Sequence, residues 1–356
     1  MIAEEPLTEP ANPEMGSTAS PPTMPALAFN RRISDLLEAA LSNGGTLRPL
    51  VDLALADPRM DVQLRARGSV SWVSFYCGLT SILDVHERSG DFAFKAHSTH
   101  QANGKFTAEW LLYVPVEVAA ARIPDVEDYL RRMLAPGGVS PRYTAKEGAL
   151  QTSIARFESD EFGVFQREAV ASFPSKIGRD QVVEPLQARI WSAIEKLEKP
   201  EKWWPGVRDH GQKARPGLET DLLGIDSAGR LLVIEVKPSD ELKGLTWAPG
   251  QVRLYAEIMA TWLENHSSAP SHINEMIDQR GRIGLTTPGH HVPTEDPVRV
   301  VPIVAVGPHT PSAGAMTRMK AVHNAIHEFP PLSSLIDPLE IWEHDATGQR
   351  VSITVF

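Results

Sequence analysis

The chain has 356 residues, of which 42% are hydrophobic and 22% charged, and its formal net charge is −10. These values indicate a folded chain with two domains and sizeable cores, and the single cysteine, Cys77, excludes an internal disulfide or a cysteine-rich zinc module. No apolar run reaches the length of a membrane span and the start lacks a signal-peptide pattern, so we expect a cytoplasmic protein with no membrane partner.

The first part of the chain divides into a tail and an α+β domain. Residues 1–27 contain six prolines, four glutamates and no Lys or Arg, which predicts a disordered tail. Residues 28–150 read as a helix capped near Asn30, four strands in an antiparallel meander (61–67, 69–76, 81–86 and 91–97), and a helix ending before Pro136. We expect this domain to select the substrate, or to contact a second copy or a partner protein, and residues 151–175 to connect it to the next domain.

Residues 176–356 predict an α/β domain with a central mixed sheet flanked by helices. In chain order the patterns indicate a helix (182–198), a strand (203–208), a hairpin (218–237), a helix (249–264), a strand (299–306), a helix (314–328) and a strand (339–343). The stretch 267–297 reads as a long insertion. The core order is therefore one helix, three strands, one helix and one strand.

The hairpin gathers charged residues on one face of the sheet. Its turn has Gly229 where a three-residue loop needs a left-handed residue, which pairs Asp226 with Arg230. The same register sets Asp221 opposite Glu235, and Glu219 opposite Lys237. All four side chains then share one face, because side chains alternate along a strand.

Three carboxylates and one ammonium on one face are costly unless a cation joins them. Hard oxygen ligands suit Mg²⁺. The residues before Glu235 are apolar on both faces of the strand, as in a central strand, so the charges lie at its C-terminal end, where α/β sheets place their sites. The sequence thus predicts a metal site with a catalytic role.

Asp221 on one strand, followed on the next by Glu235-Val236-Lys237, resembles the signature of the PD-(D/E)XK nuclease superfamily. The wording around both motifs looks most like its Holliday-junction-resolvase and RecB-type branches. Thr220 stands where the family often has proline. The resemblance implies a restriction-endonuclease-like core and a deoxyribonuclease that uses Mg²⁺ or Mn²⁺ to hydrolyse phosphodiester bonds in repair, restriction or defence.

The resemblance also implies roles for particular residues. Asp221, Glu235 and the Val236 carbonyl would hold the metal, and Lys237 would orient or activate water with a pKa that burial lowers. Those branches often carry Gln-x-x-x-Tyr on the next helix, and this chain has Gln251 and Tyr255 there, on one helical face. A helical glutamate often completes the metal shell, and Glu184 is the nearest match in sequence.

DNA contact on an acidic chain has to be local. Between residues 176 and 217 there are nine basic and six acidic residues, and Arg208, Lys213 and Arg215 are the candidates for phosphate contacts because they lie closest to Asp221. Trp203 and Trp204 are candidates for base stacking.

Two other interpretations of the site stay open. One is a domain of the same fold that binds DNA or protein without cutting. The other is a zinc site among four histidines of the expected insertion, His266, His272, His290 and His291, which no carboxylate-rich spacing accompanies.

Overall fold

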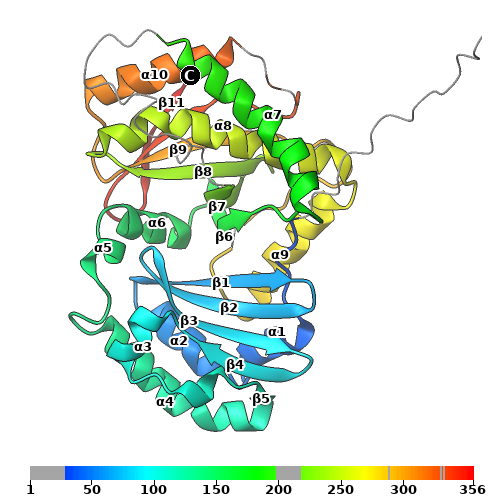
Figure 1. The fold of residues 1–356 in the computed structure, drawn as a ribbon, viewed down its shortest axis with the longest axis vertical. Coiled ribbons are helices and arrows are strands. Elements are labelled where there is room, and N and C mark those ends of the chain that lie inside the picture. Colours follow the sequence, from blue (N-terminus) through cyan, green and yellow to red (C-terminus); the bar gives the residue numbers. More distant parts are fainter. Residues whose placement is uncertain (1–28, 198–217, 288, 329–330, 332) are drawn as a thin grey trace, which may run out of the picture.

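The computed structural model describes residues 29–197, 218–287, 289–328, 331 and 333–356. Within these residues the chain is mixed α/β with two sheets, one of five strands and one of six. Figure 1 shows the two sheets in two halves of the molecule that follow each other along its long axis. No helix in the described part of the chain is both long and apolar enough to cross a membrane. The expected tail and the expected strand 203–208 lie outside the described residues. The same is true of Trp203, Trp204, Arg208, Lys213 and Arg215.

The N-terminal half is a five-stranded sheet with helices on one face. Its strands are β1 (Met60–Arg67), β2 (Val70–Cys77), β3 (Thr80–Arg88), β4 (Asp91–Lys95) and β5 (Val114–Pro115). Its helices are α1 (Asp35–Leu41), α2 (Arg48–Ala56), α3 (Ser98–Gly104), α4 (Val116–Leu134) and α5 (Pro141–Thr144), with a 3₁₀ turn at Ala108–Leu111. The expected antiparallel meander is confirmed by the ladders from β1 to β4.

The two faces of this sheet differ in chemistry because side chains alternate along its strands. Val62, Leu64, Val73 and Phe75 point into an apolar core shared with α2 and α4. The opposite face is polar. Strand β1 contributes Gln63, Arg65 and Arg67 to it, and β2 contributes Trp72, Ser74 and Tyr76. The first helix begins later than expected, because Ser34 rather than Asn30 caps it by accepting from the Leu37 N–H.

The second half is built on a six-stranded mixed sheet with the order β11-β10-β9-β8-β7-β6. The strands are β6 (Phe162–Val170), β7 (Glu219–Asp226), β8 (Leu231–Pro238), β9 (Val300–Gly307), β10 (Glu340–His344) and β11 (Arg350–Val355). β7 is antiparallel to its two neighbours, β6 and β8, whereas β8, β9 and β10 run parallel. All eight residues of β8 are buried, which confirms it as a central strand.

Helices cover both faces of the six-stranded sheet (Figure 1). They are α6 (Glu147–Arg156), α7 (Lys176–Glu195), α8 (Leu242–Asn265), α9 (Ala269–Ile283) and α10 (Ala313–His327). Residues of α7, α8 and α10 pack with Leu223, Leu231 and Val233 on one face. Residues Leu150 and Ile154 of α6 pack with Ile234 on the other. Helix α8 begins seven residues before the expected start at 249. Pro249, which marked the expected start, lies inside the helix.

The hairpin register is confirmed where the strands pair. Leu222 lies opposite Ile234 and Ile225 opposite Leu231, and Gly229 has a φ of +75°. The Asp226 N–H donates to the Arg230 carbonyl, as expected, and the Asp226 carboxylate accepts from the Arg230 N–H and guanidinium. The ladder ends at Leu222 and Ile234, so the expected ladder pairs Asp221–Glu235 and Glu219–Lys237 do not form. Glu219 lies opposite Val170 of β6 instead.

The segments expected to be a connection and an insertion both contribute elements to the fold. The connecting segment 151–175 contains β6, an edge strand of the six-stranded sheet, and the expected insertion 267–297 contains α9. β6 buries Gln166 and Arg167, which breaks its apolar pattern. Helix α9 does have a helical apolar period, through Ile273, Met276 and Ile277, which the interpretation as an insertion missed. Arg280 donates to the Val62 carbonyl of β1, and Ile283 joins the N-terminal core. The two halves therefore share packing and hydrogen bonds.

Candidate functional site

The predicted acidic and basic residues meet where β7 and β8 leave their ladder. Asp221, Glu235 and Lys237 point to the face of the sheet that α8 covers, because they alternate in phase with Leu223 and Val233. The Lys237 Nζ lies 2.8 Å from the Glu235 Oε1. The Asp221 Oδ2 accepts a hydrogen bond from the Val236 N–H at 2.7 Å, which ties this carboxylate to β8.

A third carboxylate, which the sequence interpretation missed, reaches the same ammonium. Glu147 is the first residue of α6, and its Oε1 lies 3.7 Å from the Lys237 Nζ. The segment had been assigned to the end of the N-terminal domain, where a glutamate in a short helix gives no signal of its own. Its proximity to Lys237 comes from the packing of α6 against β8, a contact between residues far apart in the sequence.

The cluster has three carboxyl groups, Asp221, Glu235 and Glu147, but only one ammonium, that of Lys237. Burial raises the pKa of Glu235 to about 8, with the charge of Asp221 adding to the effect and Lys237 opposing it. Burial likewise raises the pKa of Asp221 and that of Glu147. For Lys237, burial lowers the pKa, but the attraction of Glu235, Asp221 and Glu147 outweighs it, and the net pKa is raised. The expectation of a lysine with a lowered pKa was therefore wrong, because three carboxylates surround it.

The helical pair predicted from the sequence also reaches the site. Tyr255 is buried on α8. Burial raises the pKa of its hydroxyl most, and the negative charges of Glu235 and Asp221 raise it further. Gln251 lies one turn earlier on the same helix, as a spacing of four residues allows, and its side chain acts to lower the pKa of that hydroxyl. The phenol therefore stays protonated and stands beside the carboxylates as a hydrogen-bond donor.

The donor set fits a hard divalent cation. The Glu235 Oε2 is buried without a hydrogen-bond partner, a costly arrangement that a cation would relieve. In the described part of the chain no three His, Cys, Asp or Glu side chains are yet gathered as a metal would require. At this site the carboxylates have other partners: the Lys237 ammonium lies between Glu235 and Glu147, and the Val236 N–H donates to Asp221.

Other candidates are not brought to the cluster. Glu184 is exposed on α7, which packs against α8 and α10, and no recorded contact within the described residues joins it to the carboxylates. The structure therefore does not bring Glu184 to the cluster, and its role in a metal shell stays a prediction. His290 bonds to the Asp160 carbonyl and His291 to the Asp278 carboxylate, so these two histidines have separate partners. Arg208, Lys213 and Arg215 lie outside the described residues.

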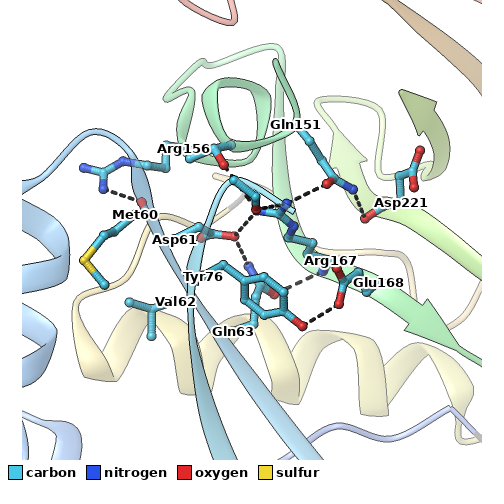
Figure 2. Close-up of polar contacts among 12 residues, drawn as sticks. Met60, Asp61, Val62, Gln63, Tyr76, Gln151, Arg156, Arg167, Glu168 and Asp221 are labelled. Atoms are coloured by element: carbon cyan, nitrogen blue, oxygen red, sulfur yellow. Dashed lines mark hydrogen bonds and ion pairs between the residues drawn. The ribbon is translucent and has the colours of Figure 1, made fainter. Parts of the chain in front are cut away.

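A buried polar network links the site to the N-terminal sheet (Figure 2). Its centre is Arg167 of β6, which is fully buried and donates to the Gln151 Oε1 at 2.6 Å and to the Gly78 carbonyl. The Arg167 Nη1 also lies 3.8 Å from the Asp61 Oδ2 on β1, and the guanidinium stacks over Tyr76. Gln151 in turn donates to the Asp221 carbonyl at 3.4 Å.

This network gives the N-terminal half a physical connection to the site. In Figure 2 the amide of Gln151 meets the backbone of Asp221, while the Asp221 carboxylate points away from the network. Arg167 can therefore fix the position of β7 through Gln151 without touching the reactive side chains. No sequence pattern marks this role, because a lone arginine in an edge strand reads as a solvated charge.

Comparisons of the chain with protein-family models, with curated proteins and with solved structures returned no match. Conclusions about function therefore rest on the residues of the site and their geometry. Those residues are two strand carboxylates, a third carboxylate from α6, a lysine bridging two of them, and a tyrosine and glutamine from α8.

Proposed function

We propose that this chain is a metal-dependent nuclease of the PD-(D/E)XK type that hydrolyses phosphodiester bonds in DNA. The observation that carries the proposal is the convergence of Asp221, Glu235 and Lys237 at the end of a buried strand, with one carboxylate oxygen of Glu235 left without a partner. A buried carboxylate oxygen without a hydrogen-bond partner is costly even when its other oxygen is paired, and such atoms are found mainly where a ligand or a reaction uses them.

The order of the elements supports the same proposal. The chain runs α6, β6, β7, β8, α8 and β9, which is one helix, three strands, one helix and one strand. The first helix and first strand are α6 and β6 instead of the segments expected from the sequence. Two further helices are inserted in this order, α7 between β6 and β7 and α9 between α8 and β9. In this arrangement Glu147 takes the part of the helical glutamate for which Glu184 had been the candidate.

A divalent cation such as Mg²⁺ or Mn²⁺ would be held by Asp221 and Glu235, with the Val236 carbonyl and Glu147 as further oxygen donors. When bound, it would lower the pKa of a water and offset the negative charge that develops at phosphorus. In the reaction the water oxygen bonds to phosphorus, the bond to one sugar oxygen breaks, and that oxygen leaves with a proton.

The remaining groups act through charge and hydrogen bonding. Lys237 is protonated at neutral pH because its pKa is raised, so it serves as a fixed positive charge for a phosphate oxygen and not as a general base. The Tyr255 hydroxyl keeps its proton because its pKa is raised, so it can donate a hydrogen bond to a phosphate oxygen. Both groups are buried, which strengthens their effect on a charged phosphate.

The test is cleavage by the purified full chain of plasmid, linear duplex and single-stranded DNA, with Mg²⁺, Mn²⁺ or EDTA. We expect cleavage that EDTA abolishes, and a loss on the order of 100-fold or more in Asp221→Asn, Glu235→Gln and Lys237→Ala. A matched control is Asp296→Asn. It removes one carboxylate from an exposed loop that precedes β9, at the opposite end of the parallel β8–β9 pair from Lys237.

Two results would contradict the proposal. The first is cleavage that persists in EDTA or in Asp221→Asn while the variant unfolds cooperatively. The second is DNA binding without cleavage by the wild-type chain under any of the three metal conditions, which would favour a domain of the same fold that binds and does not cut.

A further inference from the structure

A groove with a volume of about 1000 Å³ separates the polar face of the N-terminal sheet from the start of α7 and β7. Six basic residues line it: Arg31, Arg32, Arg65, Arg67, Lys176 and Arg179. Its acidic lining is limited to Asp84, Glu168 and Glu219. On a chain with a net charge of −10, this excess of basic lining concentrates positive charge in one place.

Two of the six cations are available for a ligand. Arg67, at the end of β1, and Lys176, the first residue of α7, are exposed, and no ion-pair partner is recorded for either within the described residues. Arg65 is instead buried against Gln166, and Arg179 is paired with Asp180. Arg67 and Lys176 come from the two halves of the molecule, so an anionic ligand between them would touch both walls.

The same groove contains an aromatic platform. Trp72 lies on the polar face of β2, between Arg65 on β1 and His86 on β3. Its ring stacks on the His86 ring, with centroids 5.6 Å apart and planes 13° from parallel. Trp72 is partly exposed and lines the groove. An aromatic ring beside cations on an open sheet face is the combination that binds unpaired bases and their backbone.

The groove leads to the proposed active site. Glu219 lines the groove and lies two residues before Asp221 on β7, so their side chains share a face about 7 Å apart. Burial, Glu168 and Asp221 raise the pKa of the Glu219 carboxyl, whereas Arg65 and Arg31 act to lower it. Glu219 is therefore close to both the cations of the groove and the site.

We infer that the groove binds one strand of single-stranded DNA and leads it to Asp221. This inference rests on the proposed nuclease function for its choice of ligand. Arg67 and Lys176 contact phosphates, and Trp72 stacks on a base. A single strand fits these contacts better than a duplex, because the base faces of a duplex are covered by the neighbouring base pairs and are not offered to Trp72.

The test measures binding without cleavage. Asp221→Asn in EDTA is titrated against labelled (dT)₂₀, a duplex of equal length and (U)₂₀, and fluorescence anisotropy is followed at several salt concentrations. In this background we expect Arg67→Glu with Lys176→Glu to weaken (dT)₂₀ binding at least tenfold. Loss of two phosphate contacts should also make the slope of log affinity against log salt shallower by about 1.4.

Matched variants separate the groove from general charge effects. Lys320→Glu reverses an exposed charge on α10, outside the groove lining, and should leave (dT)₂₀ affinity within about twofold of the background protein. Trp72→Ala should weaken binding roughly fivefold or more, and Trp72→Phe should restore most of it, since a stacking ring remains. Cooperative urea unfolding of each variant shows that the fold is kept.

Several outcomes would overturn the groove assignment: unchanged (dT)₂₀ affinity in the double variant, tighter binding of the duplex, or equal or tighter binding of (U)₂₀. Tight binding of polyglutamate at the same residues would assign the groove to an acidic protein instead. The two proposals fail separately. Metal-dependent cleavage with groove variants that bind normally would remove only the groove, whereas groove-dependent binding without any cleavage by wild type would remove only the nuclease.

Discussion

Replacing Arg167 with methionine should destabilise the whole protein and not only the strand that carries it. The guanidinium is fully buried between the two halves, where it bonds to Gln151 and the Gly78 carbonyl and lies near Asp61. Methionine has a similar length and fills the volume, so the change removes hydrogen bonds more than packing. It removes the ion pair of the Asp61 carboxylate, also buried, which then keeps only the attraction of Arg280 beyond ion-pair distance.

The size of the effect follows from what is left unpaired. Removing one partner from a buried charged pair costs about 3–5 kcal/mol, because the other charge stays buried without compensation. Asp61 keeps one hydrogen bond, from the Gln63 amide, which moderates the cost. We therefore expect a loss of about 3–4 kcal/mol in the free energy of unfolding, a large part of the ~5–15 kcal/mol typical of a native protein.

Urea unfolding of the full chain, followed by tryptophan fluorescence and circular dichroism, measures this loss. Arg131→Met is the matched control, because Arg131 is 61% exposed and its ion pair with Glu127 should contribute less than about 1 kcal/mol. A loss below about 1 kcal/mol in Arg167→Met, or two well separated transitions in the wild type, would refute the conclusion that this network joins the halves into one cooperative unit.

Three further predictions test the site and its surroundings. Glu147→Gln should lower metal-dependent cleavage at least tenfold while leaving (dT)₂₀ binding in EDTA unchanged, and unaltered cleavage would remove Glu147 from the site. A fragment beginning at Glu168 should fail to cut DNA and to unfold cooperatively, because it lacks α6 and most of β6, so a stable and active fragment would contradict the fold described above. Burial lowers the pKa of His344 to about 4, so its unfolded form binds more protons between pH 6.5 and 4. Its contribution to stability is therefore complete above about pH 6.5 and falls by up to about 3 kcal/mol toward pH 4; His344→Asn should flatten this part of the pH profile in urea titrations, and an unchanged profile would show that His344 does not cause it.

The hairpin and its charged face could be predicted from the sequence because they depend on local rules. Alternation along β7 and β8, a turn with Gly229, and an apolar run before Glu235 fix the register and the face without knowledge of the rest of the chain. The same holds for Gln251 and Tyr255, whose spacing places them on one side of α8. The register predicted from the turn is confirmed for the pairs from Leu222 to Ile225.

The contributions of α6 and β6 could not be predicted because they depend on contacts between distant parts of the chain. β6 carries Gln166 and Arg167 inside the protein, where a strand pattern would place apolar residues, and a bulge between Val164 and Gln166 breaks its period. Glu147 meets Lys237 only once α6 packs on the sheet. The raised pKa of Lys237 comes first from Glu235 and Asp221, and Glu147 of α6 adds to it.

The central claim is that carboxylates of β7 and β8 form one site for a divalent cation. Titration of Mn²⁺ into the wild-type chain without DNA, followed by electron paramagnetic resonance of the free ion, tests it most directly. We predict saturable binding that Asp296→Asn retains and that Asp221→Asn and Glu235→Gln each weaken at least tenfold. Equal Mn²⁺ binding in all four proteins, or none in the wild type, would contradict the claim.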